Sequence, residues 1–294
     1  MGAKLNIGFI GAGNMGGAII RGYAEARRSE NSCMRPTDIY VYNPSTEKVD
    51  RIIGDYPEVS KSESLSALAE ASDILMVCVK PQIIDDVFES LADTDLTEKT
   101  IISIAAGISI GYIKKALGPG TKVVRAMPNT PAMAGEGMTA LAAEIDVTST
   151  GLFMAHQIFS SFGQAIWVDE SLMDIVTGVS GSSPAYAYMY IQGLIDAGIK
   201  GGLAKEAATI MAAQATLGAA KMVLAGLDSG TSPEQLRINV CSPGGTTIEG
   251  VNLLSDAGFT ELVEKAAEAS AAKSRSVKNL SHAAGGNSII FASC

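Results

Sequence analysis

The chain has 294 residues, of which 47% are hydrophobic and 18% are charged, and its formal net charge at pH 7 is -9. This length is sufficient for two domains that each have a hydrophobic core. The acidic balance and the absence of a run of lysines and arginines argue against nucleic acid or an anionic membrane as a partner.

The first predicted elements are a strand over residues 5–10 and a helix over 15–28, joined by a glycine-rich turn. Gly11, Gly13 and Gly16 have the spacing GxGxxG. In dinucleotide-binding turns the first glycine adopts a positive φ, the second lets a pyrophosphate approach, and the third allows close packing of helix on strand. The flanking strand and helix therefore favour a dinucleotide site over an ordinary glycine-rich turn. The candidate cofactor residues here are Gly11, Ala12, Gly13, Asn14, Met15 and Gly16.

Strand-like and helical segments alternate as far as residue 168. The strand-like segments are rich in β-branched residues and almost continuously apolar, which is typical of strands buried on both faces. Helical patterns at 64–71 and 110–117 separate some of them. We therefore expect an α/β domain over residues 1–168, with a doubly wound, Rossmann-type parallel sheet. The later strands are predicted at 38–42, 74–79, 100–105, 122–126, 138–142 and 165–168.

The end of the second predicted strand bears on which dinucleotide binds. An acidic residue at this place hydrogen-bonds the ribose 2′-hydroxyl of NAD and repels a 2′-phosphate. Here the strand is followed by Asn43, Ser45 and Lys48, with no carboxylate at that place. These side chains favour NADPH, with NADH or dual use left open. The alternative is that the segment is only a turn with a helix cap.

Loops after three later strands are expected to line the reactive end of the cofactor, because ligands of open α/β sheets bind beyond the carboxyl ends of the strands. Small residues in the second loop let a flat ring approach the backbone, and two prolines stiffen the third. Lys80 in the first loop could contact the cofactor or a substrate, and the alternative is an ordinary solvated lysine. The candidate cofactor residues in these loops are Val79, Lys80, Pro81, Ala105, Ala106, Gly107, Met127 and Asn129.

Residues 169–294 differ in composition and are predicted to form an all-helical domain. The segment 183–227 is rich in Ala, Met and Leu, and 261–278 has a helical pattern. A domain as apolar as this one would expose hydrophobic surface as a monomer. We therefore expect a homo-oligomer, with a self-contained bundle as the alternative. Charged residues interrupt its apolar stretches, and we find no run of about 20 apolar residues that predicts a membrane span.

The cellular location is predicted from the cysteines and the N-terminus. The four cysteines are far apart and include no CxxC pair, which argues against a metal site or a disulfide framework and favours reduced thiols. Met1 leads directly into a strand pattern, with no basic and apolar segment of the kind found in secretory signals. We therefore expect a cytoplasmic protein.

A second candidate anion site lies at residues 242–249, where a Pro-Gly-Gly turn precedes Thr246, Thr247 and an apolar helical pattern. A helix start presents free backbone N–H groups to an anion. The segment has no preceding strand and no lysine, so it is not a P-loop. A small carboxylate is therefore a better candidate ligand than a nucleotide. Thr246 and Thr247 as purely structural caps are the alternative. Residues 181–186 also combine a turn with a helix start, and a structural helix cap without a ligand is the alternative there.

The motifs, in this order and spacing, resemble those of the pyrroline-5-carboxylate reductase family over nearly the full length of the chain. The matching segments are GAGNMG at 11–16, VKP at 79–81, MPNTP at 127–131, SGSSPAY at 180–186 and SPGGTTI at 242–248. The resemblance implies NADPH-dependent reduction of 1-pyrroline-5-carboxylate to L-proline by hydride transfer to a cyclic imine, the last step of proline biosynthesis. It also implies a homodimer with interleaved helical domains, sometimes assembled into a ring. The chain departs from the family pattern at Ser183, Asp228 and Ser232.

The resemblance further implies roles for residues of the second anion site. Backbone N–H groups would hold the substrate carboxylate, the Thr247 hydroxyl would hydrogen-bond the imine nitrogen, and Asn239 would help to shape the site. Thr247 is thus the predicted catalytic residue. The predicted substrate-binding residues are Gly244, Gly245, Thr246, Thr247 and Asn239.

Two other functions stay open at this point. No general acid is identified, because His156 lies in a helix of the first domain and His282 near the end of the chain. A β-hydroxyacid dehydrogenase has a similar N-terminus but uses a lysine on a helix of the second domain in a GxxxK context, and we identify no lysine of this chain in a comparable context. A non-catalytic NADPH-binding sensor is the third possibility, and the intact SPGGTT segment argues against it.

Overall fold

A computed structural model describes residues 4–29, 34, 37–242 and 244–283, with side chains described as far as residue 276. The chain divides into two compact units. The sheet unit comprises the described residues up to Gly181 together with those from Ala269 onward. The helical unit is Ser182–Glu268.

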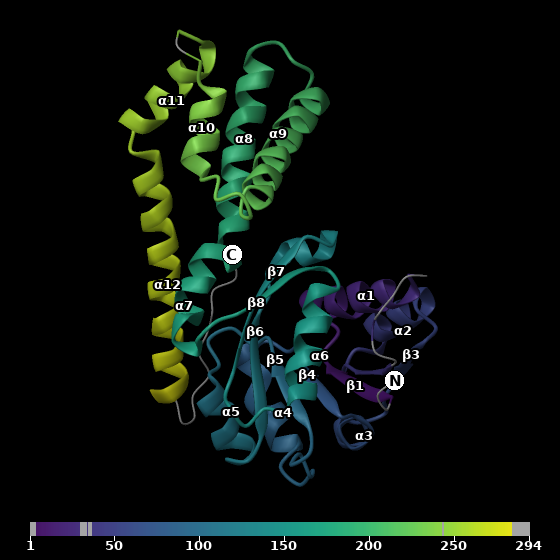
Figure 1. Cartoon of the computed structure of the whole chain (residues 1–294). Helices are drawn as coiled ribbons and strands as arrows, with labels where there is room; N and C mark the ends of the chain where they lie inside the picture. Colours follow the sequence, from purple (N-terminus) through teal and green to yellow (C-terminus); the bar gives the residue numbers. More distant parts are fainter. Residues whose placement is uncertain (1–3, 30–33, 35–36, 243, 284–294) are drawn as a thin grey trace. The chain divides into compact units, whose positions relative to one another are not determined.

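The described residues of the sheet unit include eight strands in one sheet, in the order β3-β2-β1-β4-β5-β6-β7-β8 (Figure 1). The order runs outward from β1 in one direction and from β4 in the other, so the loops after these two strands lie at a topological switch point, where α/β sheets bind ligands. The strands are β1 (Leu5–Ile10), β2 (Thr37–Tyr42), β3 (Val59–Lys61), β4 (Ile74–Val77), β5 (Thr100–Ser103), β6 (Lys122–Met127), β7 (Gly137–Ala143) and β8 (Gly163–Trp167).

The doubly wound sheet expected from the sequence is confirmed, with two differences. The short strand β3 was not predicted, because three residues are too few for a periodicity to show. The expectation that all strands are parallel was wrong for β7, which pairs with β6 in the antiparallel sense. A parallel pair needs a crossover connection of about a dozen residues. The short segment between β6 and β7, which holds the 3₁₀ turn η2 (Thr130–Ala134), leaves room only for a reversal.

Helices cover both faces of the sheet, and each face has its own apolar core. Ile7 and Phe9 of β1 belong to one cluster, which also contains residues of α1 and α6, whereas Ile10 belongs to the other, with residues of α3, α4 and α5. This alternation follows from the two-residue period of a strand. The helices are α1 (Asn14–Arg28), α2 (Thr46–Asp55), α3 (Leu65–Ala71), α4 (Ile84–Ser90), α5 (Ile110–Leu117), α6 (Ser149–Ser160) and α7 (Met173–Val176).

Short helical turns complete the sheet unit. The 3₁₀ turns η1 (Pro81–Ile83) and η3 (Glu170–Leu172) precede α4 and α7. The π-helical turn η4 (Thr177–Gly181) follows α7. The C-terminal part of α12 (Phe259–Ala283) also belongs to this unit, where Ser274 donates a hydrogen bond of 2.8 Å to the Asp174 carboxylate.

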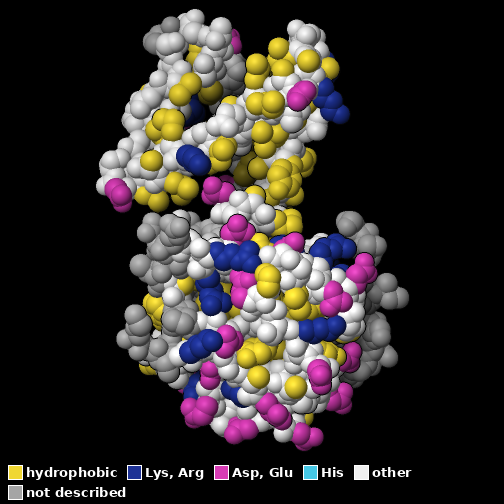
Figure 2. All heavy atoms as spheres, turned by 90° about the vertical axis from the view of Figure 1, so that its right-hand side faces the viewer, with side chains coloured by type: hydrophobic (Ala, Val, Ile, Leu, Met, Phe, Trp, Pro, Cys, Tyr) yellow, Lys and Arg dark blue, Asp and Glu magenta, His cyan; other side chains and the backbone are white. Residues whose placement is uncertain are grey.

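The helical unit contains α8 (Ser183–Lys200), α9 (Lys205–Ala225), α10 (Pro233–Val240), α11 (Thr246–Asp256) and the first part of α12. Helices α8 and α9 pack through Ile195, Ala208 and Ala212. Figure 2 shows that much hydrophobic surface remains uncovered on this unit. The most exposed large side chains, each at least half accessible, include Tyr188, Met189, Ile210, Met211, Met222, Leu224, Leu227, Val240, Leu253 and Leu262.

Helix α9 is the one described helix whose length and composition would permit a membrane crossing. The sequence-based expectation concerned uninterrupted apolar runs, and Lys205, Glu206 and Lys221 interrupt the apolar sequence of this helix. A single helix of this kind is weak evidence for a membrane span. An apolar helix that packs against a second copy of its own domain has the same composition.

Candidate active site

The glycine-rich turn connects β1 to α1, and its glycines differ in what surrounds them. Gly11 has φ +102°, and a Cβ there would lie 2.8 Å from the Cys78 carbonyl oxygen. A Cβ at Gly16 would lie 2.3 Å from the Gly11 carbonyl oxygen. The predicted positive φ of Gly11 and close packing of Gly16 are therefore confirmed. At Gly13, by contrast, no described atom lies within 4 Å of the Cβ position, so this point of the turn is open to a ligand.

Helix α1 begins at Asn14 with Gly13 as its N-cap, and no described side chain caps its first turn. The N–H groups of Asn14, Met15 and Gly16 thus lack intrahelical partners and lie at the positive end of the helix dipole. A phosphate group satisfies both conditions. The open space beside Gly13 lies at the same helix end.

Asn43, predicted as a cofactor residue, connects this turn to the loop after β2. Its Oδ1 accepts the N–H of Ala12 at 3.0 Å, and its Nδ2 donates to the Ser45 carbonyl oxygen at 2.9 Å. The amide therefore orients the loop. Ser45 and Lys48 are exposed, and neither side chain has a hydrogen-bond partner among the described residues, so both are available to a phosphate.

The loop after β4 carries Cys78, Val79 and Lys80. Cys78 is buried beneath Gly11, and burial raises the pKa of its thiol to about 12. The thiol is thus protonated at neutral pH and acts as packing rather than as a nucleophile. Lys80 is exposed at the start of η1, where Pro81 occupies the first turn.

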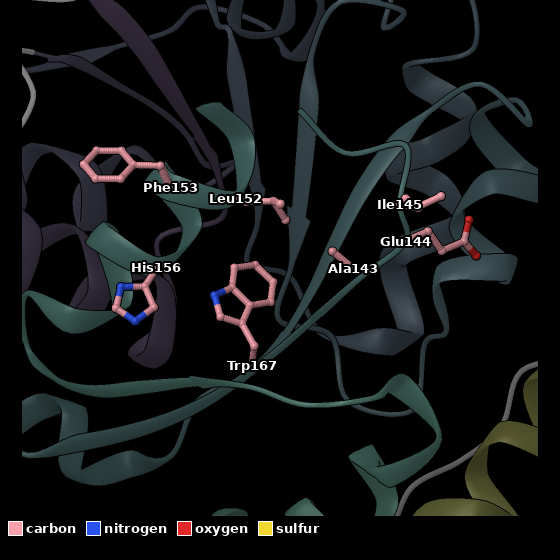
Figure 3. Close-up of a pocket in the computed structure, with 7 residues that line it drawn as sticks. All are labelled: Ala143, Glu144, Ile145, Leu152, Phe153, His156 and Trp167. Atoms are coloured by element: carbon pink, nitrogen blue, oxygen red, sulfur yellow. The ribbon is translucent and has the colours of Figure 1, made fainter. Parts of the chain in front are cut away.

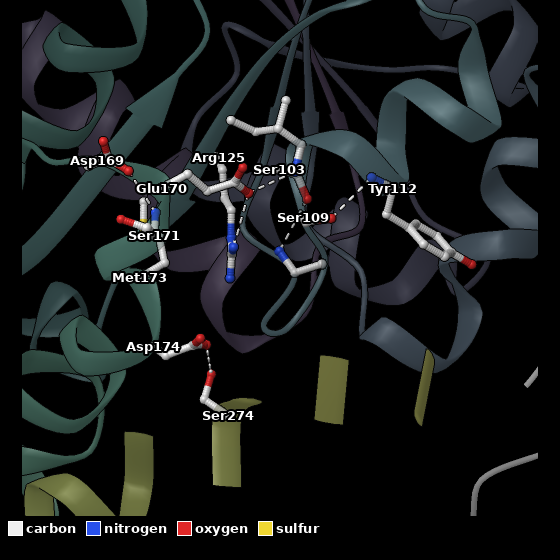
Figure 4. Close-up of polar contacts among 12 residues, drawn as sticks. Ser103, Ser109, Tyr112, Arg125, Asp169, Glu170, Ser171, Met173, Asp174 and Ser274 are labelled. Carbon is white, nitrogen blue, oxygen red and sulfur yellow. Dashed lines mark hydrogen bonds and ion pairs between the residues drawn. The ribbon is translucent and has the colours of Figure 1, made fainter. Parts of the chain in front are cut away.

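The loop after β5 contains the small residues expected there and is held at both ends. At its start the Ala105 N–H donates to Ser103 Oγ at 3.3 Å, and Gly107 has φ +79°. At its end the N–H of Ile110, the first residue of α5, donates to Glu170 Oε1 at 2.8 Å (Figure 4). Ala106 between these anchors is exposed.

The loop after β6 is held by Asn129, whose side chain is buried. Its Nδ2 donates to the Ser180 carbonyl oxygen at 3.0 Å, and its Oδ1 accepts the Met138 N–H at 2.9 Å. The Met127 side chain lies beside Gly181, where a Cβ would be 3.1 Å from its terminal methyl group. Both residues therefore connect this loop to η4 at the end of the sheet unit, and the sequence alone gave no sign of that link.

In the helical unit, the second candidate anion site lies at the start of α11. Gly244 has φ +70°, and the Gly245 N–H donates to the Ser242 carbonyl oxygen at 3.0 Å. Gly245 is the N-cap, and no described side chain caps the helix. Thr246 and Thr247 are the first two helical residues and are exposed, so the alternative that they serve as N-terminal caps was wrong.

Asn239 lies in the last turn of α10, where its Oδ1 accepts a hydrogen bond of 2.9 Å from Gln235 Nε2. Ser232, one of the departures from the family pattern, is the N-cap of this helix and accepts the Gln235 N–H at 3.1 Å. Ser183 is the first residue of α8, and Asp228 is exposed. The serine at position 232 therefore has a local structural role.

His156, which was considered as a general acid, lies apart from the loops that carry the predicted cofactor residues. It lines a cavity of about 650 Å³ on the sheet unit together with Phe153 and Trp167 (Figure 3), and its Nδ1 is 3.3 Å from Ser160 Oγ. None of the predicted cofactor residues lines this cavity. The side chain of His282 lies outside the described residues. Among the residues that the structure describes, no group of three or more His, Cys, Asp or Glu side chains is arranged to hold a metal ion.

Arg125 and Glu170 were missed by the sequence analysis. Arg125 on β6 has 3% of its side chain exposed, and its Nη1 lies 3.1 Å from Glu170 Oε1 (Figure 4). The two residues are 45 positions apart in the sequence, and neither belongs to a motif. An arginine between the apolar residues Val123, Val124, Ala126 and Met127 was the one available signal, because a buried charge needs a partner.

Comparisons with known proteins agree with the resemblance that the sequence motifs show. The family model described as pyrroline-5-carboxylate reductase dimerisation matches residues 170–277, and the model described as NADP oxidoreductase coenzyme F420-dependent matches residues 6–107. Pyrroline-5-carboxylate reductase of Escherichia coli is 40% identical over 260 residues, which are 88% of this chain and 93% of the relative. That of Methanosarcina acetivorans is 39% identical over 268 residues, 90% of this chain and 96% of the relative.

Solved structures give the same result. The pyrroline-5-carboxylate reductase of Coxiella burnetii has a TM-score of 0.83 at 34% identity, covering 93% of this chain and 98% of that one. The crystal structure of Plasmodium falciparum pyrroline carboxylate reductase with NADP bound has a TM-score of 0.79 at 33% identity, with the same coverage of 93% and 98%. The chain therefore belongs to the pyrroline-5-carboxylate reductase family.

Proposed function

We propose that the protein reduces 1-pyrroline-5-carboxylate to L-proline with NADPH, the last step of proline biosynthesis. One structural observation carries the proposal: two helices, α1 and α11, begin after a glycine N-cap, and among the described residues no side chain caps either. One helix start suits the pyrophosphate of a dinucleotide, and the other suits a small carboxylate. Membership of the reductase family supports both assignments.

The cofactor assignment is NADPH, with NADH also possible. The solved Plasmodium falciparum relative is described with NADP bound. In this chain Ser45 and Lys48 supply a free hydroxyl and a free ammonium group in the loop after β2. The proposed contacts with the rest of the cofactor are the residues predicted from the sequence in the glycine turn and in the loops after β4, β5 and β6.

The substrate assignment places the carboxylate of the imine at the Gly244–Thr247 helix start, on the N–H groups of Gly244, Thr246 and Thr247, since the Gly245 N–H already donates to the Ser242 carbonyl oxygen. When bound, NADPH would supply the hydride for C5 of the protonated imine, whose π electrons would move to nitrogen. The products are NADP⁺ and a secondary amine, so no further oxidant or reductant is needed. The Thr247 hydroxyl hydrogen-bonds the imine nitrogen, and Asn239 shapes the site. Catalysis in this scheme comes mainly from positioning.

We also propose a two-domain organisation, with residues 1–168 binding the cofactor and 169–294 binding the substrate and a second copy of the chain. The match of residues 170–277 to a dimerisation model and the exposed apolar side chains of α8, α9 and α11 support a homodimer. Assembly of dimers into a ring is a further possibility. A cytoplasmic protein without nucleic-acid or membrane partners fits the acidic charge and the small-molecule substrate.

The experiment that tests this function is consumption of NADPH in the presence of 1-pyrroline-5-carboxylate, compared with NADH. We expect imine-dependent oxidation of the cofactor, faster with NADPH. Oxidation of a hydroxy acid by NADP⁺ without imine reduction would instead identify a β-hydroxyacid dehydrogenase. Tight NADPH binding without turnover at any pH would identify a non-catalytic sensor.

A further inference from the structure

The ion pair between Arg125 and Glu170 lies next to the loop after β5. The guanidinium group is almost fully buried, and a buried charge is stable only with a partner that is close and hydrogen-bonded. Glu170 supplies both, from the first residue of η3. Its carboxylate is 30% exposed, so one face of the pair reaches solvent.

The same carboxylate oxygen has a second partner. Oε1 of Glu170 also accepts the N–H of Ile110 at 2.8 Å, across 60 residues of sequence (Figure 4). Ile110 is the first residue of α5, and the N–H groups of a first helical turn have no partner within the helix. Ser109 caps the Tyr112 N–H at 3.1 Å. Glu170 thus adds a negative charge to the positive end of α5, where it is stabilising.

This contact fixes the far end of the loop that precedes α5. The near end is held by Ser103 Oγ, and Ser103 is paired in register with Arg125 on the neighbouring strand. Between the two anchors Gly107 takes a positive φ that lets the chain turn. The Arg125–Glu170 pair therefore holds the far end of the Ala105–Gly107 loop through Ile110, and Ser103, which holds the near end, lies beside Arg125 on the neighbouring strand.

We propose that Glu170, held by Arg125, is a positioning residue that fixes the Ala105–Gly107 loop against the nicotinamide end of the cofactor. The inference rests on the proposed function in so far as this loop is taken to line the reactive end of NADPH. The Glu170 carboxylate contacts the Ile110 N–H and the Arg125 guanidinium, so we expect it to act on the cofactor through the loop backbone. Its loss therefore weakens contacts at one end of the dinucleotide only.

The test compares two ligands by titration calorimetry: NADPH, which spans the whole site, and 2′,5′-ADP, which lacks the nicotinamide half. In Glu170→Ala we expect the Kd of NADPH to rise about tenfold, which corresponds to about 1.4 kcal/mol, with the Kd of 2′,5′-ADP unchanged. Glu170→Gln keeps an acceptor for the Ile110 N–H, so we expect a smaller rise, about threefold.

Glu58→Gln is the matched control. Glu58 also pairs with an arginine, Arg28 at 2.8 Å, but it precedes β3 and so lies at the amino end of that strand, whereas the cofactor loops follow the carboxyl ends of their strands. We expect both Kd values to stay as in the wild type. If Glu170→Ala does not fold, the Glu170→Gln variant carries the same comparison.

Equal losses of affinity for the two ligands would indicate general destabilisation and overturn the proposal, as would an unchanged NADPH affinity in the folded variants. These readouts need no imine reduction. A wild-type protein that binds NADPH but does not reduce 1-pyrroline-5-carboxylate would therefore refute the proposed function and leave this test intact.

Discussion

Replacement of single glycines in the turn after β1 should separate stability from cofactor binding. In Gly16→Ala the new methyl group would lie 2.3 Å from the Gly11 carbonyl oxygen and 2.9 Å from Cys78 Cβ. Neither atom is the end of a flexible side chain, so the backbone must shift. Overpacking of this kind costs about 1–3 kcal/mol. For a unit of this size we expect Tm to fall by roughly 3–10 °C.

Gly13→Ala should behave in the opposite way. The methyl group would enter space in which no described atom lies within 4 Å, and the φ of −69° and ψ of −169° suit alanine. Alanine is a poorer N-cap than glycine but restricts the unfolded chain, so the two effects leave stability within about 1 kcal/mol of the wild type. The same methyl group stands where the pyrophosphate is proposed to approach, so we expect the Kd of NADPH to rise about tenfold or more.

The assay combines thermal denaturation of the ligand-free protein with NADPH titration for both variants. We expect a large loss of Tm in Gly16→Ala and a large loss of affinity with nearly unchanged Tm in Gly13→Ala. Wild-type affinity in Gly13→Ala would show that no phosphate lies beside this residue. An unchanged Tm in Gly16→Ala would show that the close packing described above does not constrain the turn.

Three further predictions concern other parts of the molecule. Thr247→Ala should lower kcat/KM for the imine about tenfold, or about 1.4 kcal/mol in transition-state binding, while Thr247→Ser retains most activity; unchanged steady-state kinetics in the alanine variant would remove the hydroxyl from the mechanism. Lys48→Glu should raise KM for NADPH about tenfold and leave KM for NADH unchanged, and parallel changes for the two cofactors would contradict a 2′-phosphate contact. Burial raises the pKa of Cys78 from 9.0 to about 12, so its contribution to stability is complete below pH 9 and is lost as pH rises toward 12. Melting curves across this range should show a shallower loss of Tm in Cys78→Ala than in the wild type, and identical slopes would refute the assignment.

The parts of the fold that the sequence predicted well depend on local patterns. The strand over 5–10 and the helix over 110–117 have the bounds expected from hydrophobic periodicity. The positive φ of Gly11 and the close packing of Gly16 followed from their spacing, because a strand-to-helix turn leaves few alternatives for the backbone. The helix start at Thr246 was visible for the same reason, since a turn sequence and an apolar periodic segment stand side by side.

The parts that were not predicted depend on contacts between distant segments. Asn43 and Asn129 were expected as cofactor residues, yet their amides are engaged with protein backbone on neighbouring loops. Glu170 reaches Ile110 across 60 positions, and nothing in the local sequence of either residue indicates the other. The antiparallel β7 likewise follows from how the chain returns to the sheet edge rather than from its own composition.

The central claim is that hydride passes from NADPH to C5 of a cyclic imine carboxylate. The most direct measurement uses NADPH deuterated at C4 of the nicotinamide, on the face from which hydride is transferred, with 1-pyrroline-5-carboxylate in ordinary water. We expect one proline with a single deuterium at C5, detected by mass spectrometry and NMR, for each cofactor oxidised. Proline without deuterium, or cofactor oxidation without proline, would contradict it.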